Sequence, residues 1–434
     1  MEDVNGLLKK AGEPSSDALR LHPLYRGKIQ MVPKVPVRHL SDFAVWYTPG
    51  VAAVSKAIQQ EKGKVYEYTN RANTIAIVSD GTRVLGLGNV GPEAAIPVME
   101  GKALIFKYLG GVDAIPVCVS ATGVDDLVSL CKWISPSFGG INLEDIESPK
   151  CFYLLDRLRR ELDIPVFHDD QQGTAVVVLA GLKNALRVVG KSLEEVKVAM
   201  VGMGAANVAN LRLMLKAGVR IENVVACDVK GIITEDRASE FPQDSVLHDL
   251  ATMSNAEGKT GGIKEALQGA DVCIAFSRPG PNTILPGWIS AMNDDAIVFA
   301  CANPVPEVWP WDAVENGAKV VATGRSDFPN QVNNSLGFPA IFRGALDVRA
   351  KKITEEMCIA AADAIADFAC ARGLDENHIV PTMEDEEMYV REAVAVAKMA
   401  IEQGVAALSM SDEELLRVVE QNIRRGKELT ERVT

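Results

Sequence analysis

Short apolar runs alternate with longer apolar or amphipathic segments along most of this chain. The short runs are rich in β-branched residues and end at polar or glycine-containing positions, which is typical of buried strands. The segments between them have helical length. The predicted strands are residues 74–78, 114–120, 164–167, 196–201, 223–227, 271–276, 296–300 and 320–323. This alternation of strands and helices predicts an α/β fold.

Helical segments lie between the strands and at both ends of the chain. Residues 1–30 are expected to form a short helical arm, and residues 31–38, with two prolines, an extended connector. From about residue 352 onward the pattern is helical. The predicted helices outside the arm include residues 101–108, 175–189, 208–217, 355–371, 387–402 and 412–425. In a chain of 434 residues, this order indicates two α/β domains and a helical C-terminal extension.

Composition and charge narrow the class of protein. The chain is 47% hydrophobic and 24% charged, which is ordinary for a globular protein with a large core. Its formal net charge of −13 argues against nucleic acid or an anionic membrane as a partner, because both require a basic face. No apolar run reaches the length of a membrane span, and the N-terminus lacks a secretory pattern. The eight cysteines lack the paired spacing of a zinc site, so we expect buried thiols in a cytoplasmic protein.

Two acidic pairs each follow a short apolar element. Asp169 and Asp170 follow the predicted strand 164–167, and a long helix begins soon after them. Glu144 and Asp145 form the second pair, about two dozen residues upstream. Open α/β sheets usually place their chemistry at the carboxyl ends of strands, and two carboxylate pairs can supply three or more oxygens to one Mg²⁺ or Mn²⁺ ion. The alternative is a set of helix N-caps and solvated turns.

A glycine-rich stretch follows the first predicted strand. Asp80-Gly81 indicates a hairpin turn, and the glycines after it leave the backbone open to close approach by a ligand. The next helix would hold Lys102 near this loop, although a lysine on a helix is more often solvated. Upstream, Tyr47 precedes a Thr-Pro-Gly turn between two helices. The alternative role for this tyrosine is to pack its ring and donate its hydroxyl to the backbone.

A dinucleotide fingerprint follows the predicted strand 196–201. Gly202 and Gly204 can make the tight turn that admits a pyrophosphate to the N-terminus of the next helix. Asn207 stands where the third glycine of the motif is usual, so the motif alone is a weak signal. Its context is stronger, because Asp228 ends the following strand, where an acidic residue can bind the adenosine ribose hydroxyls. The second half of the chain is therefore predicted to be a Rossmann-type dinucleotide-binding domain.

Amide side chains follow two later strands. Asn303 comes after the predicted strand 296–300, and Asn334 comes after the strand 320–323. Amides at strand ends near a cofactor can bind carboxylates or an amide-bearing ring. The alternative is turn chemistry, which asparagine also favours.

The ordered set of these motifs resembles the malic enzymes, specifically the short, single-module type of bacteria and archaea. The resemblance covers nearly the whole chain. It implies an N-terminal domain for malate and metal over residues 1–165, a Rossmann domain for NAD(P) over residues 166–390, and a helical segment over residues 391–434. The implied reaction is oxidative decarboxylation of L-malate to pyruvate and CO₂. The matching segments are residues 47–52, 80–88, 101–102, 144–145, 168–174, 202–207, 302–304, 324–334 and 337–339.

The resemblance also implies roles for individual residues. Glu144, Asp145 and Asp170 are similar to the family's three metal ligands. Lys102 is similar to the lysine that takes the proton of the C2 hydroxyl, and Tyr47 to the tyrosine that returns a proton to C3 of the enolate. A lysine acts as a base only when it is neutral, so we expect burial and the nearby cation to lower the pKa of Lys102.

Further matches concern the substrate. Asp169 resembles the carboxylate beside the catalytic lysine. Arg83 resembles the clamp on a malate carboxylate, a role that suits its fork of donors. Asn303 and Asn334 match the family's substrate-binding amides.

The expected cofactor is NAD, with NADP as the alternative, together with Mg²⁺ or Mn²⁺. The carboxylate of Asp228 would repel the 2′-phosphate of NADP, whereas Lys230, two residues on, would neutralise it. The expected cofactor-binding residues are Gly202, Gly204, Ala205, Ala206, Asn207, Asp228, Lys230 and Asn303.

Two other functions stay open from the sequence. One is nonredox decarboxylation of malate with a tightly held NAD, and the other is a non-catalytic relative that only binds nucleotide and acid. The presence of Lys102, Tyr47 and the three carboxylates argues against the second. We also expect a homodimer or a higher homo-oligomer, because the N-terminal arm is short, partly apolar and poorly able to bury itself.

Overall fold

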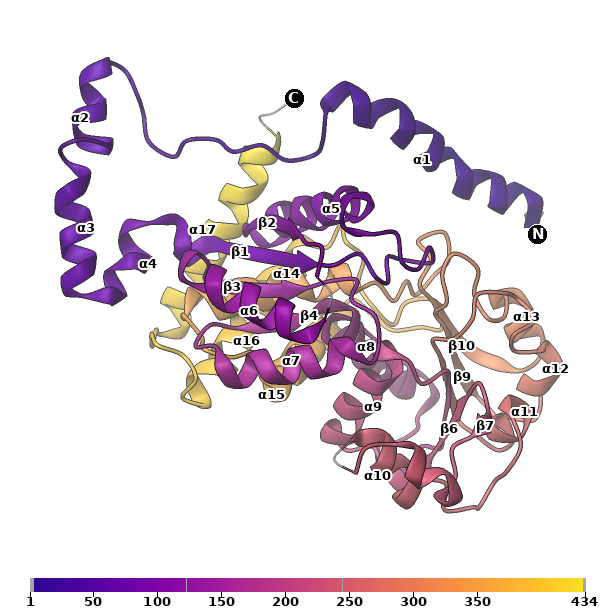
Figure 1. Ribbon diagram of the computed structural model, residues 1–434. Helices are drawn as coiled ribbons and strands as arrows, with labels where there is room; N and C mark the ends of the chain where they lie inside the picture. Colours follow the sequence, from indigo (N-terminus) through magenta and orange to yellow (C-terminus); the bar gives the residue numbers. More distant parts are fainter. Residues whose placement is uncertain (1–3, 122, 244, 432–434) are drawn as a thin grey trace.

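The computed structural model describes residues 4–121, 123–243 and 245–431, which form two sheets with helices packed around them (Figure 1). The first sheet has four parallel strands in the order β2-β1-β3-β4. Its strands are β1 (Thr74–Ser79), β2 (Asp113–Cys118), β3 (Gly140–Leu143) and β4 (Val166–His168). The connections run through α5 (Pro92–Gly110), α6 (Val124–Ile134) and α7 (Lys150–Glu161).

The second sheet has six strands in the order β10-β9-β8-β5-β6-β7. All its pairs are parallel except the short pair between β6 and β7. The direction of the strand order reverses between β5 and β8, and ligands of doubly wound sheets bind at such a switch point. The strands are β5 (Val198–Val201), β6 (Val224–Asp228), β7 (Gly231–Ile232), β8 (Val272–Ala275), β9 (Ala296–Ala300) and β10 (Ala318–Thr323). The helices are α9 (Ala205–Ala217), α10 (Val246–Met253), α11 (Ile263–Leu267), α12 (Pro286–Ile289) and α13 (Pro310–Glu315).

Five further helices contribute to the core that both sheets share. The helix α8 is apolar on almost every side and lies in the middle of the largest core, which also contains Ile77 of β1, Met200 of β5 and Phe342 of α14. A helix that is apolar all round is stable only when it is buried on all sides. The five helices are α8 (Thr174–Val189), α14 (Phe338–Asp347), α15 (Glu355–Ala371), α16 (Glu386–Glu402) and α17 (Asp412–Glu431).

The helical extension does not form a separate body at the end of the chain. Both α14 and α17 pack against α5 of the first sheet, and α15 packs against α8. The expected limit between residues 165 and 166 falls just before β4, which pairs with β3 of the first sheet. The domain boundaries along the sequence stay a prediction. In space, the C-terminal helices pack back against the N-terminal sheet.

Three features of the fold differ from the sequence prediction. Asp80-Gly81 does not form a hairpin, because β1 pairs in parallel with β2 and β3 and the chain leaves the sheet at this point. The strand β2 is only partly buried, because it lies at the edge of the sheet. The helix α14 is not among the predicted helices, since Gly337 and Pro339 interrupt its pattern; a proline in the first turn is nevertheless compatible with a helix.

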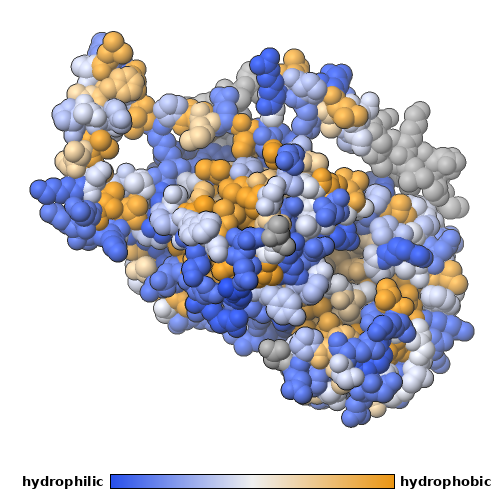
Figure 2. All heavy atoms as spheres, viewed as in Figure 1, coloured by the Kyte–Doolittle hydropathy of each residue, from blue (hydrophilic) through white to orange (hydrophobic). Residues whose placement is uncertain are grey.

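The first described part of the chain, up to Tyr68, lies outside the body of the protein. It is longer than the arm expected over residues 1–30, and we call this whole segment the arm. It comprises α1 (Val4–Tyr25), α2 (Phe43–Trp46), α3 (Val51–Gln60) and α4 (Val65–Tyr68), and none of the residues of α2, α3 or α4 is buried (Figure 1). Large apolar side chains on α2 and α3 face solvent, and Figure 2 shows them as orange spheres on the projection at the upper left. The arm therefore presents an apolar surface that its own chain does not cover.

The expectations about membrane spans and cysteines can be compared with the structure. Among the described residues, no helix combines the length and the apolar character that crossing a membrane requires. The eight cysteines are all free thiols; six are buried, Cys118 is half-buried and Cys370 is exposed, so the expectation of buried thiols is wrong for the last of these.

Candidate active site

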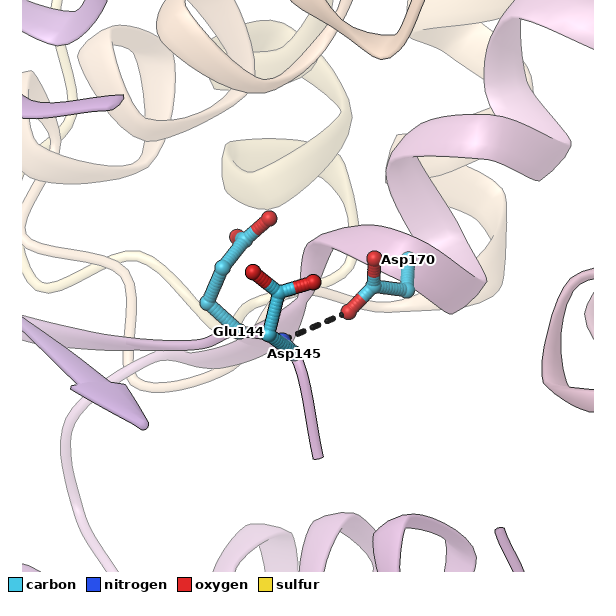
Figure 3. Close-up of side chains that lie close together, drawn as sticks. All are labelled: Glu144, Asp145 and Asp170. Atoms are coloured by element: carbon cyan, nitrogen blue, oxygen red, sulfur yellow. Dashed lines mark hydrogen bonds between the residues drawn. The ribbon is translucent and has the colours of Figure 1, made fainter. Parts of the chain in front are cut away.

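Three carboxylates meet at the carboxyl edge of the first sheet. Because β3 and β4 are parallel neighbours, the residues that follow them emerge side by side. Glu144 and Asp145 follow β3, and Asp170 follows β4 in a turn of π-helix over Asp169–Gly173. Each of the three carboxylates places an oxygen within 4.8 Å of the other two (Figure 3). Parallel pairing therefore brings together the two acidic pairs that the sequence keeps about two dozen residues apart.

The backbone holds this cluster in place. The backbone N–H of Asp145 donates to Oδ2 of Asp170 over 2.9 Å, drawn as the dashed line in Figure 3. Asp145 has a positive φ of 54°, which is uncommon for a residue other than glycine. The backbone N–H of Arg83 donates to the carbonyl of Asp145 over 3.0 Å, so the glycine-rich loop after β1 is fixed against the cluster.

The cluster fits a divalent cation. Burial and repulsion from Asp170 raise the pKa of Asp145 to about 7, and burial raises the pKa of Glu144 well above its ordinary value. Oδ2 of Asp145 is buried and has no hydrogen-bond partner. Several buried carboxylates that disfavour one another's charge are stabilised by a hard cation, and oxygen is the ligand that Mg²⁺ and Mn²⁺ prefer. Glu144, Asp145 and Asp170 are thus the residues that can hold such an ion.

Lys102 reaches the same cluster from α5. Its Nζ lies 2.7 Å from Oε1 of Glu144 and also donates to Oδ2 of Asp169, while the ring of Phe338 covers it at 4.4 Å. Burial disfavours the ammonium ion, but Asp169 and Glu144 outweigh this effect and raise the pKa of Lys102. The expected lowering of this pKa relied on burial and on a bound cation, and it stays a prediction. Burial acts in that direction here, and the two carboxylates act more strongly against it.

Asp169 connects the lysine to the second half of the chain. Its side chain is fully buried, and Oδ2 accepts a hydrogen bond of 2.5 Å from Nδ2 of Asn334. Burial raises the pKa of Asp169 to about 6, although Lys102 acts in the opposite direction. A Cβ atom added at Gly173 would lie 1.9 Å from Oδ1 of Asp169, so only glycine fits there. Gly173, which belongs to the same motif, thus leaves the space that the carboxylate of Asp169 occupies.

Two further predicted substrate residues lie at the rim of this site. The Arg83 side chain is exposed and donates to the carbonyl of Leu85 over 2.9 Å. Asn303 is exposed after β9, and its atoms lie close to Gly86 of the loop after β1 and to Gly324 after β10. The structure therefore places Asn303 where the first sheet's loop meets the second sheet.

Tyr47 is not part of this cluster. It follows α2 on the N-terminal arm, and 69% of the residue is exposed. The arm projects away from the body that contains Lys102 (Figure 1). Within one chain, the structure brings together Lys102, Asp169, Asn334 and the carboxylates, and it leaves Tyr47 outside.

The dinucleotide fingerprint forms the turn that the sequence predicts. Gly202 has a φ of 83°, and a Cβ atom there would lie 2.7 Å from the carbonyl oxygen of Phe276. Gly204 is the N-cap of α9, so the first-turn residues Ala205 and Ala206 present backbone N–H groups and little side chain at the helix N-terminus. Such a terminus is a site for the pyrophosphate of a dinucleotide.

Asn207 replaces the third glycine without blocking this turn. Its side chain is buried, and Nδ2 lies within hydrogen-bond distance of the carbonyls of Val201, Gly202 and Ile274, at 3.1, 2.8 and 3.2 Å. Asn207 thus connects the end of β5 to β8, and it packs below the turn and not in the path of the pyrophosphate.

Asp228 has a partner that the sequence analysis missed. Arg237 binds its carboxylate through two nitrogens, with contacts of 3.0 Å and 2.5 Å, and also contacts Glu240. Lys230 pairs with Glu240 at 2.9 Å, so its ammonium does not contact Asp228. The Arg237–Asp228 pair joins residues nine positions apart around a turn, and no sequence motif signals it.

Glu307 is a second residue that the sequence analysis missed. It is fully buried, and its carboxylate accepts hydrogen bonds from the backbone N–H groups of Ser277 and Ala302, over 2.7 and 3.0 Å. These residues follow β8 and β9, and Ala302 directly precedes Asn303. Glu307 therefore fixes the two strand ends beside the fingerprint. An acid between apolar residues, in the segment Val305-Pro306-Glu307-Val308, is the signal that could have found it.

Comparisons with known proteins place this geometry in a family. A model described as malic enzyme, N-terminal domain, matches residues 26–123, and one described as malic enzyme, NAD binding domain, matches residues 171–401. The chain is similar to the bifunctional malic/malolactic enzyme of Bacillus subtilis (strain 168), at 49% identity over 92% of this chain and 96% of that protein.

Two more proteins show the same likeness. The NAD-dependent malic enzyme of Geobacillus stearothermophilus is 48% identical over 88% of this chain and 78% of that protein. The crystal structure of the Entamoeba histolytica malic enzyme has a TM-score of 0.93 at 42% identity, covering 97% of this chain and 88% of that chain.

Proposed function

Because this chain belongs to the malic enzyme family, we propose that it oxidises and decarboxylates L-malate to pyruvate and CO₂ in the cytoplasm, with reduction of NAD and with one Mg²⁺ or Mn²⁺ ion. The observation that carries this proposal is the buried contact of Lys102 with Asp169 and Glu144, next to the three-carboxylate cluster. This arrangement offers a proton acceptor and a cation site side by side.

The proposed metal ligands are Glu144, Asp145 and Asp170. A divalent ion held there supplies a positive charge that polarises the C2 oxygen of malate and stabilises the charge that develops as CO₂ leaves. Arg83, Asn303 and Asn334 are proposed to bind and orient the substrate, because they carry the donors that carboxylates accept. Asn334 contacts Asp169, and the backbone of Arg83 is bonded to Asp145.

Lys102 is the proposed acceptor of the C2 hydroxyl proton. A lysine accepts a proton only when it is neutral, so it must first pass its own proton to a neighbour. Asp169 is the neighbour hydrogen-bonded to Nζ, and Asn334 holds the same carboxylate oxygen from the other side. We therefore assign Asp169 the role of receiving this proton and keeping Lys102 in position.

Tyr47 is the proposed donor of the proton to C3 of the enolate. Its own chain leaves it exposed on an apolar arm, which supports association of the arm with a second copy of the chain. We propose that the protein is at least a dimer and that Tyr47 from one copy completes the site that contains Lys102 of the other. Closed dimers with two equivalent interfaces are the commonest way to bury such a surface.

NAD is the proposed cofactor, with NADP as the alternative. Gly202, Gly204, Ala205, Ala206 and Asn207 are proposed to form the pyrophosphate turn, and Asn303 to contact the nicotinamide. Asp228 ends β6, where a carboxylate binds the ribose hydroxyls of NAD and repels a 2′-phosphate. Arg237 partly offsets that repulsion because it already pairs with Asp228, and Lys230 contributes a second, exposed positive charge.

Nonredox decarboxylation of malate to lactate is the second candidate function. The observation that favours it is the similarity to a relative named as a bifunctional malic/malolactic enzyme. The same carboxylate cluster and lysine would serve both reactions, so the products distinguish them.

One assay tests the proposal. The purified protein is incubated with L-malate and either NAD⁺ or NADP⁺, with and without Mn²⁺, and pyruvate, lactate and NAD(P)H are measured. We expect pyruvate and NADH in equal amounts, and only with the metal. Lactate without net NADH would favour the second function.

A pair of variants tests the metal site. Asp170→Ala should lose Mn²⁺-dependent activity and Mn²⁺ binding while still binding NAD⁺. Asp163→Ala, an exposed aspartate just before β4, is the matched control. Full activity of Asp170→Ala, or of the native protein under a chelator, would refute the proposed ligands.

A further inference from the structure

A cavity with several charged side chains in its walls lies on the side of α5 that faces the C-terminal helix. It has a volume of about 240 Å³ and shares no lining residue with the carboxylate cluster. Its walls come from the connector after α1, the end of α5, the start of β2, α14 and α17. Five of its lining residues are cationic and two are carboxylates: Lys34, Lys107, Arg343, Arg349 and Arg425, against Asp113 and Asp347.

The two carboxylates are already engaged by part of this set. Asp347 accepts from the buried Arg343, with Nε at 2.9 Å, and from Asn422 at 2.8 Å. Asp113 accepts from Lys107 at 2.7 Å and from Asn73 at 2.9 Å. These bonds neutralise two of the five cations and leave the lining residues alone with an excess of three positive charges.

The remaining cations have weak partners or none. The ammonium of Lys34 lies 3.8 Å from Asp113 and donates to the amide of Asn70, and Arg349 lies 3.8 Å from Glu67. The guanidinium of Arg425 makes no hydrogen bond or ion pair to any described residue, although Arg425 lines the cavity. This local excess of positive charge stands out in a chain whose net charge is −13.

The positive charges also act on one another. Burial lowers the pKa of Lys34 and Asp113 opposes this, but Arg425, Lys107 and Arg343 lower it further. Cations that converge without enough counter-charge destabilise each other, and an anion bound between them would remove that cost.

We propose that this cavity is a binding site for a small anion that carries phosphate groups. Guanidinium and ammonium groups together are the usual ligands of phosphate, and three excess positive charges suit a diphosphate better than a single carboxylate. The cavity is concave, and its walls combine apolar surface with a few convergent polar groups, as sites for small molecules commonly do.

Binding here would reach the active site through two elements. The helix α5 forms one wall and carries Lys102, and α14 forms another and begins directly after the segment with Asn334. A phosphate bound between them would hold α5 and α14 together. We therefore expect the ligand to change the KM for malate more than kcat.

The test is direct binding of inorganic pyrophosphate and of inorganic phosphate to the full-length protein. Isothermal titration calorimetry is done without divalent ions and with saturating NAD⁺, so that neither a metal nor the fingerprint turn takes up the probe. Arg425→Ala and Lys34→Ala remove the two outer cations. Arg417→Ala is the matched control, because it removes an exposed arginine from the same helix outside the cavity.

We expect the native protein and Arg417→Ala to bind pyrophosphate equally, and more tightly than phosphate. Arg425→Ala should weaken binding by about tenfold, the loss of one charge-assisted contact of roughly 1.4 kcal/mol. Lys34→Ala, on an exposed connector, should weaken it without affecting folding. No binding by the native protein at millimolar pyrophosphate, or equal binding by Arg425→Ala and Arg417→Ala, would overturn the proposal. The readout needs no turnover, so it is independent of the proposed reaction.

Discussion

The two residues proposed to move protons lie in opposite surroundings. Lys102 is buried in the body of the protein, with two carboxylates in contact and an aromatic ring above it. Tyr47 is 69% exposed on an arm that makes few contacts with the body. The difference shows that one chain by itself brings together the residues proposed to oxidise malate and bind metal. The proposed proton donor, Tyr47, needs a further contact from outside its own chain to be positioned.

The largest effect is expected from removing Lys102, the buried one of the two residues proposed to move protons. Lys102→Ala removes the proposed base, and a positioned general base contributes about a hundredfold to ten-thousandfold. We expect kcat for malate oxidation to fall by about a thousandfold while NAD⁺ binding, measured by fluorescence titration, is retained. Lys132→Ala, an exposed lysine in a surface ion pair, should remain near native activity. A loss of only a few-fold in Lys102→Ala would remove the lysine from the proposed mechanism.

The role of the exposed Tyr47 is tested by mixing two variants of low activity. Tyr47→Phe should slow protonation of the enolate by about a hundredfold, with less effect on hydride transfer. If Tyr47 acts in the site of a second copy, a mixed dimer of Tyr47→Phe and Lys102→Ala contains one intact site. Equal mixing should then restore about a quarter of the native activity.

A second mixture is the control for this experiment. Lys102→Ala mixed with Asp170→Ala should stay inactive, because both residues belong to the cluster formed within one chain and neither site of that dimer is intact. No recovery in the first mixture, or sedimentation of the native protein as a monomer at micromolar concentration, would contradict the shared site.

The nucleotide fold is expected to depend only on its own chain. Asp228→Ala removes the repulsion of a 2′-phosphate and releases Arg237, which can then bind that phosphate. We expect the ratio of kcat/KM for NAD⁺ over NADP⁺ to fall by about tenfold, or to invert. Asp236→Ala, on the same turn, is the control. An NADP⁺ preference in the native protein would refute the choice of cofactor.

The smallest effect concerns a buried acid away from the active site. Glu392 on α16 is fully buried, neither oxygen has a partner, and burial raises its pKa well above the ordinary 4.5. Its folded form stays protonated where the unfolded chain already ionises. Glu392 therefore lowers stability progressively as pH rises above 4.5 toward its folded pKa, at about 1.4 kcal/mol for each unit of the shift.

Glu392→Gln should remove this dependence. Urea unfolding should show the variant gaining stability relative to the native protein as the pH rises above about 5. Glu402→Gln, an exposed residue on the same helix, is the control. A constant difference between variant and native protein across this range would show that Glu392 is ionised in the fold. The comparison of Glu392 with Lys102 thus distinguishes the effect of burial without a partner from the effect of burial beside opposite charges.

Much of the architecture could be predicted because it depends on local pattern. Most of the parallel strands were visible as apolar runs, although β3 was recognised only as a short apolar element. Parallel pairing of β3 with β4 then brings Glu144, Asp145 and Asp170 to one edge. The fingerprint turn could be predicted for the same reason, since Gly202 and Gly204 lie between a strand and a helix. The prediction of a hairpin at Asp80-Gly81 was wrong because a two-residue signal cannot show which strands pair.

The features that pattern could not predict depend on contacts between distant residues. Arg237 neutralises Asp228 around a turn, and Glu307 holds two strand ends through backbone groups. The balance of charges that raises the pKa of Lys102 depends on three elements meeting in space. The position of Tyr47 relative to a second copy is not contained in the fold of one chain.

Gly173 has a consequence for anyone who wants to make this protein more robust. Its φ of −63° and ψ of −44° are helical, so a stabilisation protocol that replaces glycine by alanine at helix-compatible positions would select it. The backbone would accept the exchange, but the added methyl group would occupy the place of the Asp169 carboxylate. A design rule based on dihedral angles alone would therefore displace Asp169, the proposed partner of Lys102, for a small gain in helix stability. The side-chain surroundings of Gly173 have to be considered as well, and they exclude this position.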